Sequence, residues 1–128
     1  MFKRSKAEAP QRERDGLVSS ILLQQGDVPE SQLSITWVKV APGSSQHPHQ
    51  HLPEQVYVIT QGKGRMYVGK EEQEVTVGDL IYIPPNIVHH VENLSHETLT
   101  YISAATPAFD LTALYDTGDL RPKGEKRE

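Results

Sequence analysis

The chain has 128 residues, 36% of them hydrophobic, and a formal net charge of −4, which fits a single domain with one hydrophobic core. It has no cysteine, which excludes disulfide frameworks, thiolate zinc sites and thiol nucleophiles. Residues 16–115 hold four Lys/Arg against ten Asp/Glu, an acidic balance that argues against a nucleic-acid partner.

The first 16 residues are rich in charged side chains and are expected to form a flexible N-terminal arm. They lack the apolar region of a secretory signal, and no run approaches the length of a membrane span. We therefore expect a soluble, cytoplasmic protein with no membrane partner.

From Leu17 onward, short runs rich in Val, Ile, Tyr and Thr alternate with Gly, Pro, Asn and Asp. This pattern is typical of an antiparallel sandwich or barrel. Eight strands are predicted, at residues 17–25, 33–41, 55–60, 64–69, 72–77, 80–84, 88–93 and 98–103. Eight strands suit an all-β jelly roll.

The domain is expected to span residues 17–115, with a polar C-terminal tail at 116–128. The segment 105–120 is too apolar for a free tail, because it contains Phe109, Leu111, Leu114 and Tyr115. We expect it to pack on the barrel or on a partner subunit. This segment and the apolar strand that begins at Leu17 could exchange across a two-fold axis, which favours a homodimer.

The histidines carry the strongest chemical signal, since all six lie between residues 47 and 96. Side chains alternate along a strand, so His49 and His51 share a face and can offer two imidazole nitrogens to one ion. Transition metals require further ligands. The candidates are Gln55 and the distant His89, although Pro53 interrupts the alternation between His51 and Gln55.

Two motifs around these residues resemble those of the cupin superfamily, and of its small single-domain, type-2 members in particular. The first, G(x)5HxH(x)3,4E(x)6G, is matched by Gly43, His49, His51, Gln55 and Gly62, with Gln55 in place of Glu. The second, G(x)5PxG(x)2H(x)3N, is matched by Gly78, Pro84, Asn86, His89 and Asn93, with Asn86 in place of Gly. Both Asn and Gly tolerate a positive φ.

The resemblance implies a double-stranded β-helix, the jelly-roll cupin barrel, whose mouth holds one divalent transition metal: Fe, Mn, Ni, Cu, Co or Zn. It assigns the ligand positions to His49, His51, Gln55 and His89. A rival register, with His47 and His49 followed by Glu54, would restore the carboxylate but loses the two motif glycines. In the first register the amide neutralises no charge, so the ion would keep its full +2 and favour anionic oxygens.

The pattern supports two classes of function. The first is a metal-dependent enzyme, of dioxygenase or isomerase and ring-opening type, that acts on a small, oxygen-rich, chelating substrate such as a sugar acid or an enol. The second is a non-catalytic module that binds or senses a small molecule, since the predicted strand 98–103 contains no Asp, Glu or Lys to act as a general base. Tyr57 is the candidate catalytic residue, and a core aromatic is an equal interpretation of it.

Overall fold

The computed structural model describes residues 1–108. This part of the chain is built from strands and contains no helix, and hence no helix able to span a membrane. The strands are β1 (Gln11–Arg14), β2 (Leu17–Leu23), β3 (Ser34–Val40), β4 (Glu54–Gln61), β5 (Lys63–Val68), β6 (Glu71–Thr76), β7 (Leu80–Ile83), β8 (His89–Glu92) and β9 (Leu99–Thr106).

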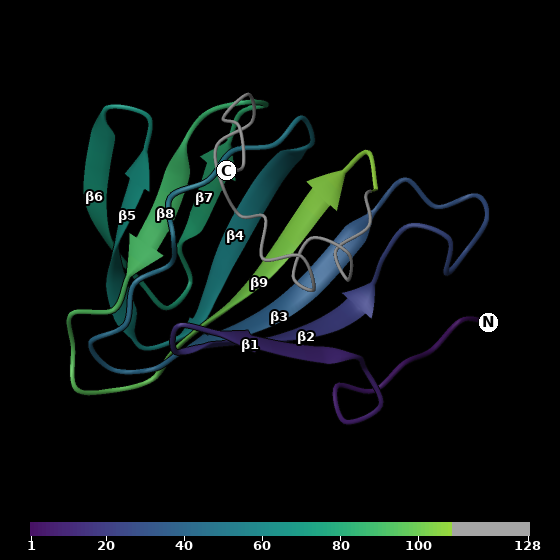
Figure 1. Ribbon diagram of the computed structural model, residues 1–128, viewed down its shortest axis with the longest axis horizontal. Coiled ribbons are helices and arrows are strands. Elements are labelled where there is room, and N and C mark those ends of the chain that lie inside the picture. Colours follow the sequence, from purple (N-terminus) through teal and green to yellow (C-terminus); the bar gives the residue numbers. More distant parts are fainter. Residues whose placement is uncertain (109–128) are drawn as a thin grey trace, which may run out of the picture.

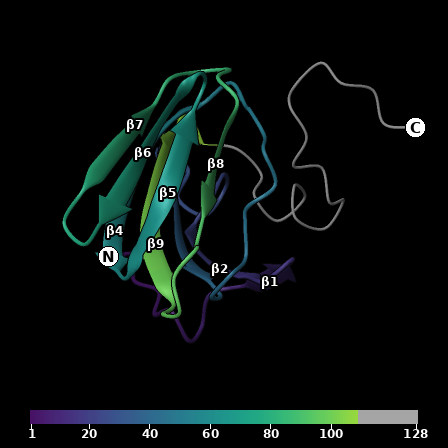
Figure 2. The same ribbon diagram turned by 90° about the vertical axis from the view of Figure 1, so that its left-hand side faces the viewer.

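The strands form two antiparallel sheets that face each other (Figures 1 and 2). The larger sheet has the order β1-β2-β3-β9-β4-β7 and the smaller one the order β6-β5-β8. The expected all-β class is confirmed, and each of the eight predicted strands is present.

Strand β1 was not predicted, and it lies within the charged arm at residues 1–16. It pairs with β2, with Gln11 opposite Ser20 and Arg14 opposite Leu17. Its sequence, QRER, has no apolar alternation because the strand lies at the sheet edge and is largely exposed. Strand β2 is therefore paired on both sides within the chain, by β1 and β3.

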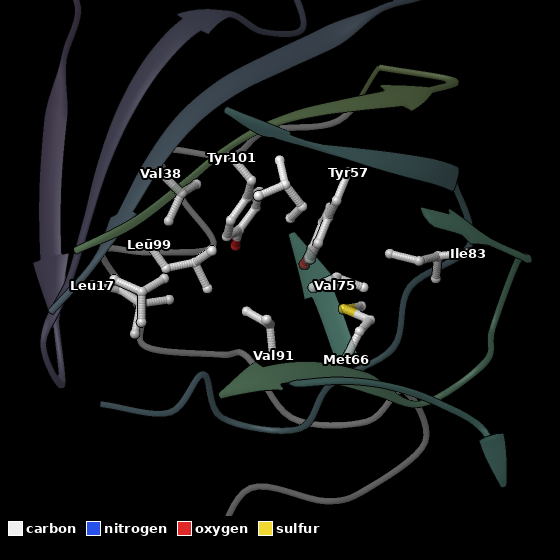
Figure 3. Close-up of a cluster of buried hydrophobic side chains, with 11 residues drawn as sticks. Leu17, Val38, Tyr57, Met66, Val75, Ile83, Val91, Leu99 and Tyr101 are labelled. Atoms are coloured by element: carbon white, nitrogen blue, oxygen red, sulfur yellow. The ribbon is translucent and has the colours of Figure 1, made fainter. Parts of the chain in front are cut away.

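The hydrophobic core lies between the two sheets and follows the period-two alternation of the strands. In β3, Val38 and Val40 are buried while Lys39 between them is exposed. Strands of both sheets contribute to the core, which contains Leu17, Val38, Val40, Tyr57, Ile59, Met66, Val75, Ile83, Val91, Leu99 and Tyr101 (Figure 3).

The segment that precedes β4 runs antiparallel to β8 and brings the two sequence motifs together. Isolated bridges join Ser45 to Glu92 and His49 to His89. Further backbone hydrogen bonds join Gln46 N–H to Val91 O at 2.8 Å and Asn93 N–H to Ser44 O at 2.9 Å. The segment therefore pairs along the edge of β8, beside the smaller sheet, and this pairing places His49 next to His89.

Two motif positions have backbone requirements that explain their residue types. Gly62 has a φ of 76°, and a Cβ placed there would lie 2.4 Å from Thr98 O. Asn86 has a φ of 57°, a conformation that Asn adopts more readily than most residues with a side chain. The substitution of Asn for Gly in the second motif therefore keeps the turn.

The predictions for the C-terminal part reach beyond the described residues. The apolar side chains Phe109, Leu111, Leu114 and Tyr115, the domain end at residue 115 and the tail at 116–128 all lie there.

Candidate metal centre

Three histidines from two segments that are distant in the sequence converge in the structure. His49, His51 and His89 each offer one ring nitrogen, and these three atoms lie within 4.8 Å of one another. The ring centroids of His49 and His89 are 4.3 Å apart, and those of His51 and His89 are 5.1 Å apart. The cluster contains no carboxylate from residues 1–108. It could hold a metal ion.

Backbone pairing fixes the positions of these histidines. His49 N–H donates to His89 O at 3.1 Å, and His89 N–H donates to His49 O at 2.9 Å. The backbone of His51 is held by the turn before β8, because Asn86 N–H donates to His51 O at 2.8 Å. The cluster is therefore supported by main-chain bonds between segments that are distant in sequence.

Each ring is also oriented by a main-chain carbonyl two residues away. The Nδ1 atoms of His49, His51 and His89 lie 2.8, 2.9 and 2.8 Å from the carbonyl oxygens of His47, Pro53 and Ile87. A carbonyl oxygen only accepts, so each Nδ1 carries a proton and donates it. In each neutral ring the lone pair then belongs to Nε2, which is the atom available to a metal.

Burial keeps these rings neutral. It lowers the pKa of His49 to about 3, with a further contribution from the neighbouring His89, and it lowers the pKa of His89 to about 4. Burial also lowers the pKa of His51. Neutral imidazole is the form that binds metals.

The surroundings of the His89 Nε2 atom show whether the cluster fits a metal. This atom is buried and has no hydrogen-bond partner among the described residues. An unsatisfied buried polar atom is costly, and a coordinated cation would satisfy it. The orphaned nitrogen and the three converging lone pairs therefore fit a bound cation.

Gln55 lies beside the cluster, so the interruption at Pro53 does not turn it away from the barrel interior. It is 8% exposed on β4, paired with Ile83 of β7 and Ala105 of β9. Its Oε1 atom lies 2.9 Å from Nε2 of His51, and its Nε2 atom donates to Oγ of Ser103. Three neutral nitrogens and one amide oxygen would leave a divalent ion with its full charge.

Two residues that only the rival register uses, Glu54 and His47, do not join this cluster. Glu54 is exposed, and its Oε1 atom accepts a hydrogen bond of 2.8 Å from the hydroxyl of Tyr82. The side chain of His47 is also exposed and lies outside the cluster. The geometry supports the register with Gln55.

Tyr57 is buried in the core beside the cluster. Its ring centroid is 6.2 Å from that of His89, and its ring stacks on Tyr101 at 4.1 Å. Figure 3 shows both hydroxyl groups directed into the space between the sheets. The catalytic role of Tyr57 stays a prediction, because the same placement serves core packing.

Sequence analysis missed Gln46, which links these tyrosines. Its Oε1 accepts from the Tyr57 hydroxyl and its Nε2 donates to the Tyr101 hydroxyl, both at 3.2 Å. The only sequence feature that points to Gln46 is its position inside the first motif, between Gly43 and His49. The remaining histidines lie apart from the cluster: His90 stacks on Tyr67 at 4.3 Å, and His96 is exposed.

Comparisons with known proteins agree with this fold. A family model described as a cupin domain matches residues 36–105. An uncharacterized protein of Methanocaldococcus jannaschii is 32% identical over 97 residues, which are 75% of this chain and 78% of that protein.

Solved structures with a similar fold also include cupins. An RmlC-like cupin from Shewanella frigidimarina has a TM-score of 0.73 at 18% identity, over 86% of this chain and 94% of that chain. The oxalate decarboxylase of Bacillus subtilis, a protein with Mn(II) centres, has a TM-score of 0.78 at 18% identity, over 88% of this chain and 31% of that chain. At these identities the likeness concerns the fold alone.

Proposed function

Because the chain belongs to the cupin family, we propose that it is a metal-dependent enzyme that acts on a small, oxygen-rich, chelating molecule such as a sugar acid or an enol. The observation that carries this proposal is the convergence of three Nε2 lone pairs, one of them orphaned and buried, beside an amide oxygen. A bound divalent ion would supply Lewis acidity that polarises the oxygens of the substrate.

The chain's own residues would hold the ion and keep its charge high. His49, His51 and His89 are neutral, and Gln55 contributes an amide oxygen, so no protein ligand offsets the +2 charge. An anionic carboxylate or enolate is the natural complement of such a centre. The Mn(II) centres of the structurally similar oxalate decarboxylase support a metal here, and iron, nickel, copper, cobalt and zinc suit the same donor atoms.

Isomerisation or ring opening requires a side chain that transfers protons near the metal, whereas dioxygenase chemistry depends less on one. No carboxylate in residues 1–108 joins the cluster, and the hydroxyl of Tyr57 donates to Gln46. Proton transfer by Tyr57 would require this bond to open. An oxidation that moves electrons at a redox metal needs less help from a side chain, so we place dioxygenase chemistry ahead of isomerisation.

The alternative is a module that binds a small molecule without changing it, which is favoured because no carboxylate of residues 1–108 joins the cluster. Two measurements on protein purified without chelators separate the hypotheses: metal content by elemental analysis, and dioxygen consumption with a panel of enediols and sugar acids. Turnover that depends on a redox metal supports the enzyme. Stoichiometric metal with ligand binding and no turnover supports the binding module, and an absence of bound metal overturns the metal-dependent proposal.

We also propose that the protein forms a homodimer. The outer face of the larger sheet carries a row of cross-strand neighbours, Trp37, Ile102, Val58 and Leu80, and the last of these is 61% exposed. Burial of such a face against a second copy removes apolar surface from water. Light scattering at micromolar concentration tests the assembly, and a monomer would contradict it.

A further inference from the structure

The amide of Gln55 has polar partners on both sides. On one side, its Oε1 atom lies 2.9 Å from Nε2 of His51. On the other side, its Nε2 atom donates to the hydroxyl of Ser103. Ser103 lies on β9 opposite Tyr57, one diagonal step from Gln55, and is 6% exposed. Gln55 is thus buried, and each end of its amide contacts a polar atom of the protein.

The contact between Gln55 and His51 brings together two acceptors. Nδ1 of His51 donates to Pro53 O, so in the neutral ring Nε2 presents a lone pair. The amide oxygen also presents lone pairs. Two acceptors at 2.9 Å repel each other unless a cation lies beside both of them. This orientation of the amide therefore suits a site that holds a metal ion.

The reversed amide suits an empty site. After a half-turn, the NH2 group of Gln55 donates to Nε2 of His51, and the amide oxygen accepts from the hydroxyl of Ser103. Each of these two contacts then joins a donor to an acceptor without a cation. A hydroxyl both donates and accepts, so Ser103 can partner either orientation.

We propose that Ser103 is a positioning residue that holds the Gln55 amide beside the histidines in two orientations, and that the amide reverses to present Oε1 when a cation binds. This inference rests on the proposed metal site. It explains how a neutral residue can serve as a ligand without leaving a buried acceptor pair in the empty protein. It also keeps Gln55 ordered before the metal arrives, which reduces the entropy lost on binding.

Nuclear magnetic resonance on the full-length, 15N- and 13C-labelled protein tests the reversal directly. Zinc alone is the probe, because it is diamagnetic. We expect the Gln55 side-chain amide protons to show nuclear Overhauser contacts to the ring of His51 without zinc, and to the Hβ protons of Ser103 with zinc. The same contacts in both states would overturn the inference and leave the proposed metal site intact.

A variant series tests the positioning role by zinc affinity. S103A removes the hydroxyl, and we expect its zinc Kd to rise about tenfold, in line with other outer-shell partners. S103T keeps the hydroxyl and should restore an affinity close to that of the original protein. T36A is the matched control, because Thr36 is a buried hydroxyl residue paired with Ser103 on the adjacent strand.

Each outcome has a distinct meaning. An S103A protein with unchanged zinc affinity and unaltered Gln55 contacts would overturn the role of Ser103. An equal loss of affinity in T36A would assign the effect to packing and would also overturn it. A protein that takes up no zinc or other divalent ion would overturn the proposed function itself, and this inference with it.

Discussion

His49 and His89 are paired directly across an antiparallel bridge, and each donates its backbone N–H to the carbonyl of the other. The two residues come from different sequence motifs. Their pairing sets the ring centroids 4.3 Å apart, so the geometry of the candidate metal centre depends on the register of the sheet. A side-chain substitution can therefore remove a ligand while the backbone bonds that form the site remain.

Replacement of His89 by Ala should lower the bound metal at least tenfold, because it removes one of three nitrogen ligands. Metal content is measured by elemental analysis of protein purified without chelators, and circular dichroism reports the fold. H96A is the matched control, since His96 is exposed and lies outside the cluster. Unchanged metal content in the folded H89A protein would mean that the ligand set is wrong.

Replacement of Gln55 by Glu should raise metal affinity and weaken the binding of an anionic chelator. The new carboxylate neutralises one unit of the ion's charge, so we expect malonate to bind about tenfold more weakly to the metal-loaded protein, a difference of about 1.4 kcal/mol. Calorimetry measures both affinities. The control is E54Q, which exchanges a carboxylate for an amide at the exposed neighbouring position. We expect E54Q to leave the affinities for the metal and for malonate unaltered. Tighter malonate binding to Q55E would contradict the charge argument.

The metal-free protein should lose stability in acid. Burial lowers the pKa of His49 to about 3 and that of His89 to about 4, whereas a histidine in the unfolded chain titrates near 6.5. Above pH 6.5 the two histidines are mostly neutral in both the folded and the unfolded state, so they contribute little pH dependence to the free energy of unfolding. Below it the unfolded state binds more protons, so the free energy of unfolding falls as the pH decreases toward 4.

Urea unfolding measures this effect, and we expect the free energy of unfolding at pH 5.5 to be about 3 kcal/mol below that at pH 7.5. H89L should remove part of this difference, because it removes one of the two buried imidazoles. Equal stability of the metal-free protein at the two pH values would show that these histidines protonate freely in the folded state.

Replacement of Gly62 by Ala should destabilise the fold by about 3 kcal/mol. Its φ of 76° strains a residue with a side chain, and the new Cβ would meet Thr98 O at 2.4 Å. G26A provides the comparison, since Gly26 has a φ of 93° but no atom within 4 Å of a Cβ, so only backbone strain of about 1 kcal/mol applies. Thermal or urea unfolding compares the variants, and equal losses would show that the contact with Thr98 relaxes.

Most of the fold could be predicted because strand alternation and turn residues are local signals. Every predicted strand is present, whereas β1 was missed because an exposed edge strand with a charged sequence carries no apolar pattern. The candidate ligands were also accessible to sequence analysis through the spacing of the two motifs. Alternation along the strand could not decide between Gln55 and Glu54, because Pro53 interrupts it between His51 and these residues.

The sequence by itself determined the all-β class and the cupin motifs, and it predicted His49, His51, Gln55 and His89 as ligand positions, with Glu54 as the alternative to Gln55. Only the tertiary structure decided that carbonyls fix the ring tautomers, that Gln46 links two tyrosines, and that Ser103 partners the amide of Gln55. The reason is physical. Alternation and spacing depend on neighbours along the chain, whereas a hydrogen-bond partner depends on the register between strands that meet only after folding.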